Sequence, residues 1–149
     1  MTKIRISKIF NFEAAHALFN YDGLCKHIHG HSYKLYVCVS GIVLCNSDNP
    51  KNGMLMDFGD LKKIVKKEIV DVFDHTLILN NKINSNLIIP ADNMFSRILY
   101  TDYQPTSENM VVDFAEKIMK KLPSNIKLHS LRLHETESSF AEWFAEDNV

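Results

Sequence analysis

Apolar and polar residues alternate at the start of the chain. Between residues 3 and 16 the apolar positions are Ile4, Ile6, Phe10, Phe12 and Ala14, with Lys3, Arg5, Asn11 and Glu13 between them. A period of two is typical of a strand with one buried face. A second strand is predicted over residues 31–44, HSYKLYVCVSGIVL, because this stretch is rich in tyrosine, valine and isoleucine.

Two amphipathic helices are predicted in the middle of the chain. The first begins near Asp57, after the turn-forming stretch CNSDNPKNG (45–53), and Asp57 or Asp60 can cap its free N–H groups. The second begins in PTSEN (105–109), with Thr106 or Ser107 as its cap, and ends at Pro123. The apolar positions recur at helical spacing; they are Leu61, Ile64, Val65, Ile69 and Val72 in the first helix, and Val111, Phe114, Ala115, Ile118 and Leu122 in the second.

The order of the elements predicts the fold class. The tail IKLHSLRLHETESSFAEWF predicts two short strands around a turn at 136–139, whereas residues 80–104 show no clear period. The order is therefore strand, strand, helix, helix, strand, strand. It predicts one α+β domain over residues 1–149, with a four-stranded antiparallel sheet and two helices on one face.

Composition and charge narrow the possible functions. The chain has 17 basic and 18 acidic residues, so it lacks the basic excess that nucleic acids or anionic membranes attract. No apolar run approaches the roughly 20 residues of a membrane span, and the N-terminus lacks the apolar core of a signal peptide. The three cysteines do not form a disulfide framework. We therefore expect a cytoplasmic protein that binds neither nucleic acid nor membranes.

The segment CKHIHGH (25–31) concentrates potential metal ligands. His29 and His31 are two residues apart at the start of a strand, so both imidazoles project to one side, and Gly30 leaves room for a close approach. His16 shares that face if the first two strands form a hairpin. Three imidazoles with an open fourth position are typical of catalytic zinc, although iron, copper and nickel also bind imidazole. The alternative is a chance pair of histidines on a solvated loop.

Four other residues could complete such a site, each with an alternative. Cys25 is either a fourth ligand, which would make the site structural, or a base with a thiol pKa lowered by the nearby cation. Asp74 could orient His75 as a proton relay, or the two could simply end a helix at the surface. Glu135 follows an inward-facing apolar alternation and is either a buried carboxylate that holds two N–H donors or a strand-end carboxylate in water.

Six motifs resemble those of the 6-pyruvoyl-tetrahydropterin synthase family in order and approximate spacing. They are FEAAH, CKHIHGHSY, GMLMDFGDLK, DHTLILN, PTSEN and HETESSFAEW. The resemblance extends from residue 4 to about residue 145 and is poor only over 80–104, which is longer than the family pattern. The short spacer between Cys25 and His29 is similar to that of the branch that forms 6-carboxytetrahydropterin in queuosine biosynthesis, although His27 inside it departs from the pattern.

The resemblance implies a fold, an assembly and a reaction. It implies the tunnelling fold, in which trimers close their sheets into a barrel and two trimers stack as a homohexamer. The implied substrate is 7,8-dihydroneopterin triphosphate, which the carboxy-forming branch converts to 6-carboxytetrahydropterin, acetaldehyde and triphosphate.

The resemblance also implies a role for each site residue. His16, His29 and His31 are implied to bind Zn²⁺, and Cys25 is implied to be a non-ligating catalytic base. Asp74 and His75 are implied to relay protons in the active site of a neighbouring subunit. Glu135 is implied to anchor the pterin ring, with Thr106 nearby.

Three alternative functions remain open at this point. The pyruvoyl-forming branch eliminates triphosphate from the same substrate with the same site residues. A non-catalytic, zinc-stabilised oligomeric pterin-binding protein would use Cys25 as a fourth ligand and leave Glu135 idle. A hydrolase with a zinc hydroxide would leave Cys25, His75 and Glu135 unexplained.

Overall fold

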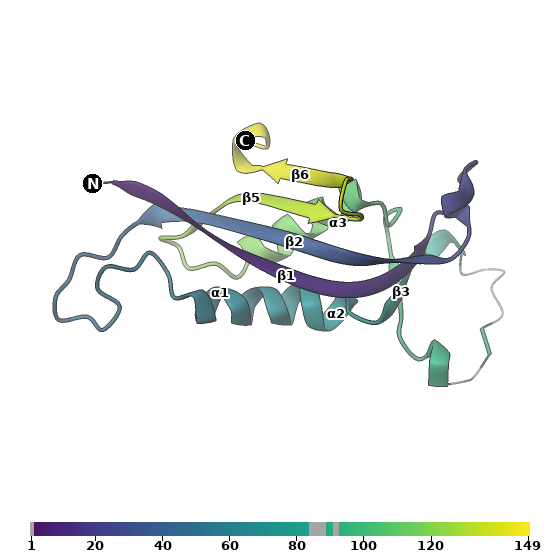
Figure 1. Cartoon of the computed structure of the whole chain (residues 1–149), viewed down its shortest axis with the longest axis horizontal. Helices are drawn as coiled ribbons and strands as arrows, with labels where there is room; N and C mark the ends of the chain where they lie inside the picture. Colours follow the sequence, from purple (N-terminus) through teal and green to yellow (C-terminus); the bar gives the residue numbers. More distant parts are fainter. Residues whose placement is uncertain (1, 84–88, 91–92) are drawn as a thin grey trace.

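A long curved sheet runs the length of the molecule, and the helices lie along one of its faces (Figure 1). The computed structural model describes residues 2–83, 89–90 and 93–149. Its strands are β1 (Lys3–Ala17), β2 (His29–Ile42), β3 (Thr76–Asn80), β4 (Ile98–Thr101), β5 (Lys127–His134) and β6 (Phe140–Phe144). Its α-helices are α1 (Phe58–Val65), α2 (Asp71–Phe73) and α3 (Ser107–Met119). Within the described part of the chain, no helix is long and apolar enough to cross a membrane.

The first two strands form the antiparallel hairpin that the sequence predicted. Their register places His16 opposite His29 and Lys3 opposite Ile42. β2 begins two residues before the predicted 31–44 because its pairing with β1 continues through Gly30. A side chain at Gly30 would lie 3.4 Å from the backbone oxygen of Ala14, an ordinary contact distance, so the strand pairing itself does not require glycine here.

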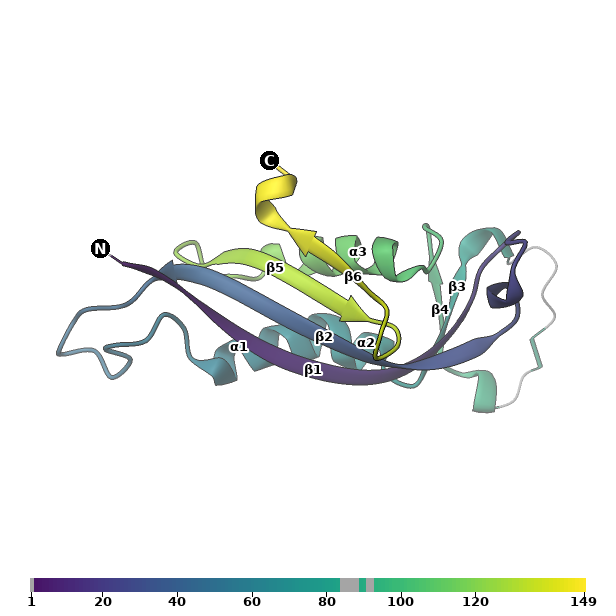
Figure 2. The same ribbon diagram turned by 45° about the horizontal axis from the view of Figure 1, so that its top comes forward.

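The sheet has six strands in the order β4-β3-β1-β2-β5-β6. β2, β5 and β6 continue the antiparallel pattern, as predicted, with β5 and β6 joined by a short turn. β3 runs parallel to β1, and β4 runs parallel to β3 (Figure 2). The predicted α+β class and the four predicted antiparallel strands are confirmed, but the sheet has six strands, and the prediction missed β3 and β4. Both are short apolar runs, whose period does not distinguish a strand from a helix.

The predicted helices and their caps are confirmed. The Asp57 side chain accepts a hydrogen bond of 2.6 Å from the N–H of Gly59 at the start of α1, and a π-helical segment (Lys66–Val70) joins α1 to α2 without a break. The Thr106 hydroxyl accepts from the N–H of Asn109, at 3.3 Å, at the start of α3. The α3 helix ends at Met119, four residues before the predicted Pro123.

The structure describes only part of residues 80–104, the stretch whose sequence shows no clear period. Residues 84–88 and 91–92 lie outside the described residues. Of the remainder, Asn81–Ile83 and Asn93–Phe95 form 3-10 turns, and Ile98–Thr101 forms β4. The described part of this stretch therefore contributes β4, which lies at the edge of the sheet.

The core lies between the sheet and the helices. Even-numbered β1 residues and odd-numbered β2 residues point into it, which confirms the buried face read from the alternation. Phe12 stacks on Tyr33 of β2 with ring centroids 5.0 Å apart. Phe114 of α3 packs edge-on against Phe73, at 4.8 Å, and Phe12, at 6.1 Å. These four rings join both helical segments to the hairpin that carries the histidines.

Truncating the central ring tests this packing. Phe114 is fully buried, so Phe114→Ala is expected to lower the free energy of unfolding by about 3–5 kcal/mol through lost burial and a residual cavity. Val112→Ala, on the exposed side of the same helix, is expected to change it by less than about 0.5 kcal/mol. Urea unfolding at one fixed protein concentration measures both. Equal losses would contradict this description of the core.

Candidate functional site

Three histidines meet on the helix-facing side of the hairpin. His16 lies near the end of β1 and is only 1% exposed, while His29 and His31 lie at the start of β2 and are half-buried. The predicted hairpin brings them together, because His16 pairs with His29 and Ala14 pairs with His31. Their ring centroids are 4.5–5.1 Å apart.

Two backbone carbonyls determine which nitrogens can bind a metal. The Nδ1 atoms of His16 and His29 lie 2.7 Å from the carbonyl oxygens of Pro105 and His27, respectively. A carbonyl oxygen only accepts, so each Nδ1 carries a proton and each neutral ring has a lone pair at Nε2. These two Nε2 atoms are 3.0 Å apart. Two facing lone pairs repel each other, so the arrangement favours a cation, or a shared proton, between them.

His31 supplies a third nitrogen without a hydrogen bond. Its Nε2 is buried and, although 2.9 Å from Oε1 of Glu135, does not meet hydrogen-bond geometry. Burial lowers the pKa of His31 below its ordinary value and outweighs the opposing effect of the Glu135 carboxylate. The neutral ring, which is the form that binds a metal, is therefore the favoured one.

Glu135 completes the cluster. Its Oε1 lies 3.5 Å from Nε2 of His16, and the ligand atoms of the three histidines and Glu135 all lie within 4.8 Å of one another. The neighbouring His16 side chain is the main cause that lowers the pKa of Glu135, and its effect outweighs that of burial. The carboxylate therefore faces the cluster, which was one of the two positions that the sequence left open.

The donor set fits a zinc ion. Tetrahedral zinc bonds imidazole nitrogen at about 2.0–2.1 Å, which puts two ligand nitrogens about 3.3 Å apart, close to the separation of the His16 and His29 Nε2 atoms. Three imidazoles and one carboxylate hold zinc without excluding other divalent ions.

Cys25 is not part of this group of ligand atoms. It lies in a 3-10 turn, Leu24–Lys26, and is half-buried. Its carbonyl oxygen accepts a hydrogen bond of 2.9 Å from the N–H of Leu18, which ties the turn to the end of β1. Among the described residues, the fourth place beside the histidines belongs to Glu135 instead.

Thr106 lies near the cluster because the residues on either side of it, Pro105 and Ser107, interact with His16 and Glu135. Its hydroxyl caps α3, and the preceding residue, Pro105, provides the carbonyl that accepts from His16. Ser107, the first residue of α3, also helps to lower the pKa of Glu135. The start of α3 is therefore one wall of the site.

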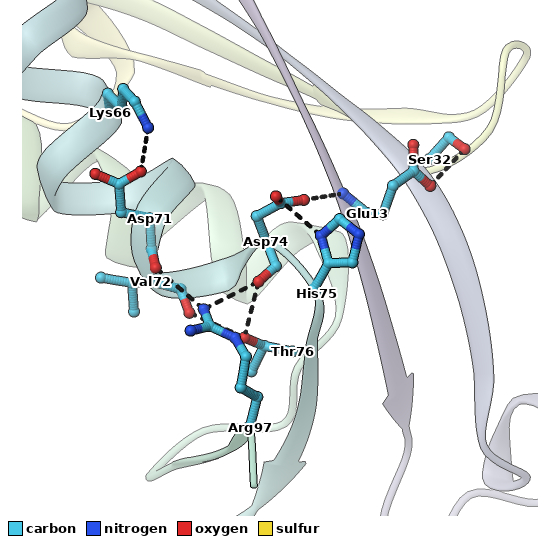
Figure 3. A network of polar contacts seen from close by, with 9 residues as sticks. All are labelled: Glu13, Ser32, Lys66, Asp71, Val72, Asp74, His75, Thr76 and Arg97. Carbon is cyan, nitrogen blue, oxygen red and sulfur yellow. Dashed lines mark hydrogen bonds and ion pairs between the residues drawn. The ribbon is translucent and has the colours of Figure 1, made fainter. Parts of the chain in front are cut away.

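Asp74 and His75 lie outside the ligand group, beside Glu13 of β1. Asp74 accepts hydrogen bonds at 2.9 Å from the N–H of Glu13 and from Nδ1 of His75 (Figure 3). The N–H of Glu13 is the main cause that lowers the pKa of Asp74. His75 therefore carries its proton on Nδ1, and its Nε2, on a ring that is 74% exposed, is free to accept one.

The relay pair lies beside Glu13 of β1, outside the group of ligand atoms that the histidine cluster forms among the described residues. His75 lines a pocket of about 530 Å³ with Glu13, Ala15 and Ser32, and His31 of the cluster lines the same pocket. The structure confirms that Asp74 and His75 are paired.

Sequence reasoning missed the groups that orient the ligands. The carbonyls of Pro105 and His27 carry no sequence signal, because every residue has one. Tyr33, whose hydroxyl lies 3.4 Å from Nδ1 of His16, follows the alternation of β2 and could have been found from it. Burial raises the pKa of Tyr33, so it stays a neutral phenol beside the cluster.

The chain is similar to known pterin enzymes over nearly its whole length. The family profile described as 6-pyruvoyl tetrahydropterin synthase matches residues 5–146. Proteins named 6-carboxy-5,6,7,8-tetrahydropterin synthase from Haemophilus influenzae and Rickettsia conorii are 36% and 31% identical to it, over 93% of this chain in each case and 97% and 99% of theirs. The 6-pyruvoyl tetrahydropterin synthase structure from Caenorhabditis elegans aligns over 97% of both chains with a TM-score of 0.69 and 24% identity, which supports the same fold.

Removal of one ligand tests the metal centre. The original protein is expected to hold about one zinc ion per chain. His29→Ala is expected to lose most of this zinc on dialysis, because two imidazoles hold zinc poorly. His129→Ala, a half-buried histidine of β5 outside the cluster, is the matched control and should keep its zinc. Elemental analysis of the purified proteins measures both. The assignment is wrong if the two variants retain equal zinc.

Proposed function

The chain belongs to the 6-pyruvoyl tetrahydropterin synthase family, and from this membership and the histidine cluster we propose that it is a zinc-dependent 6-carboxytetrahydropterin synthase. The proposed reaction converts 7,8-dihydroneopterin triphosphate and water to 6-carboxytetrahydropterin, acetaldehyde and triphosphate. Its proposed biological role is in queuosine biosynthesis in the cytoplasm. The observation that carries the proposal is the cluster of three imidazoles, whose ligand atoms lie within 4.8 Å of one another, in a chain 36% identical to a protein of that name.

The ligand set supports binding of the substrate side chain at the metal. His16, His29 and His31 would hold zinc through Nε2. The chemistry that zinc supplies when bound is Lewis-acid polarisation of the side-chain oxygens. Glu135 is proposed to accept hydrogen bonds from the 2-aminopyrimidine edge of the pterin, because it is held as a carboxylate at the edge of the cluster. The wall formed by Thr106 would lie against the ring.

Two groups are proposed to move protons. Cys25, close in sequence to the ligands and outside the ligand set, would remove a proton from the side-chain carbon next to the ring. His75, oriented by Asp74, would accept or return protons through its exposed Nε2. Because His75 is not part of the ligand group of its own cluster, we propose that it serves the site of a neighbouring subunit. This arrangement supports an oligomer, which we propose to be a hexamer of two stacked trimers.

The product identifies the branch of the family. Zinc-loaded protein incubated with 7,8-dihydroneopterin triphosphate is expected to form 6-carboxytetrahydropterin and an equimolar amount of acetaldehyde. Mass spectrometry of the pterins, with an acetaldehyde assay on the same samples, measures both. A 6-pyruvoyl product without acetaldehyde would assign the chain to the other branch. Unchanged substrate, with zinc and oligomer intact, would instead favour a non-catalytic binding protein.

The role of Cys25 can be separated from metal binding. Cys25→Ala is expected to keep its zinc and to lower kcat by about 10²–10⁴-fold, the usual contribution of a positioned acid or base. Cys45→Ala removes an exposed cysteine distant in sequence and should leave both unchanged. Loss of zinc from the Cys25 variant would show that the thiol is a ligand and exclude the proposed base.

A further inference from the structure

The turn that carries the relay pair is strained and needs support. His75 has a φ of 55°, in the left-handed region that costs most residues free energy. It is separated from the end of α2 only by Asp74, so the turn must also provide partners for the last carbonyls of a helix. One hydrogen bond on each side fixes it to β1: the N–H of His75 donates to the carbonyl of Glu13 at 2.6 Å, and Asp74 accepts from the N–H of Glu13.

Two side chains provide the remaining partners (Figure 3). The Thr76 hydroxyl donates to the carbonyls of Val72, at 3.1 Å, and Asp74, at 3.3 Å. Nη2 of Arg97 donates to the carbonyls of Asp71, at 3.1 Å, and Asp74, at 3.0 Å. The guanidinium thus links the end of the helix to the peptide that joins Asp74 to His75. Its positive charge also suits the C-terminal end of a helix.

Arg97 is itself held in place by the sheet. It directly precedes β4, and its own carbonyl accepts a hydrogen bond of 2.9 Å from the N–H of Leu77 in β3. Its backbone is therefore fixed beside the strand that begins one residue after His75. It also lines the same pocket as His75. The side chain turns back from that strand toward the end of α2, which makes it a brace on the turn.

From these contacts we propose that Arg97 is a positioning residue for the Asp74–His75 pair. It acts through His75, by holding the left-handed turn in the conformation that keeps Nδ1 of His75 on Asp74 and leaves its Nε2 exposed. This inference rests on the proposed function for its catalytic consequence. Its structural part, the rigidity of the turn, can be tested without any assumption about the reaction.

The kinetic test uses Arg97→Met, which keeps the length of the side chain but removes the donors. We expect kcat to fall about 10–100-fold, since small misplacement of a catalytic group has effects of this size, and KM to change less than about threefold, because ground-state binding is untouched. Arg97→Lys retains the charge and can reach one carbonyl, so its kcat should lie between that of Arg97→Met and that of the original protein. Lys82→Met removes an exposed charge from the same stretch and should behave as the original protein.

A double-mutant cycle separates positioning from a general structural effect. In a His75→Ala background, Arg97→Met should lower kcat by less than about a further twofold, because the imidazole that Arg97 positions is no longer present. The same loss in both backgrounds would overturn the proposal, as would an unchanged kcat in the single variant. Zinc content and oligomer mass are measured for every variant, so that only intact proteins are compared.

Hydrogen exchange tests the turn independently of turnover. In Arg97→Met the amides of Asp74 and His75 are expected to exchange about tenfold faster, as two hydrogen bonds are lost, with no change in Lys82→Met. Unchanged protection would overturn the proposal. If the original protein leaves 7,8-dihydroneopterin triphosphate unconverted, the proposed function fails, and this exchange result alone decides whether Arg97 positions the turn.

Discussion

The register between β1 and β2 is the constraint on which both the core and the site depend. The pairing that places His16 opposite His29 also places Phe12 opposite Tyr33. A slip of one residue would move both the histidines and the aromatic residues to the other face of the sheet. Burial of Phe12 and Tyr33 against the helices therefore stabilises the register in which the histidines converge. The hydrophobic core positions the ligands without contacting the metal itself.

The packing of the helices also determines the orientation of a metal ligand. The carbonyl of Pro105 lies immediately before the cap of α3 and accepts from Nδ1 of His16. If α3 packed differently on the sheet, His16 would lose the partner that determines its tautomer, and its Nε2 would no longer be a defined ligand. The aromatic packing of Phe114 thus acts at a distance on the metal site. Folding energy and metal affinity are linked through one helix.

The sequence predicted the parts of the site that follow from local periodicity. The alternation in β1 and the H-x-H spacing in β2 placed His16, His29 and His31 on one face, and the pattern before Glu135 gave its inward direction as one of two possibilities. The paired caps, Asp57 and Thr106, followed from their position before an amphipathic run. Each of these predictions depends only on residues within one element or one hairpin.

What the sequence could not predict depends on contacts between distant segments. β3 and β4 pair in parallel, and the partner of a short parallel strand lies beyond any local pattern. The placement of Asp74 and His75 beside Glu13 depends on the β1–β3 register, which places Ala14 opposite Thr76. Arg97 reaches its carbonyl partners across more than twenty residues of sequence, and a single arginine in a stretch without a period carries no signal of this role.

A difference in exposure between the cluster and His75 gives these scattered observations a common physical cause. Within the cluster, burial keeps the His31 imidazole neutral and suited to bind a cation. The His75 ring is exposed, and its Nε2 stays accessible because Asp74 holds only Nδ1. A metal ligand and a proton carrier need these opposite environments.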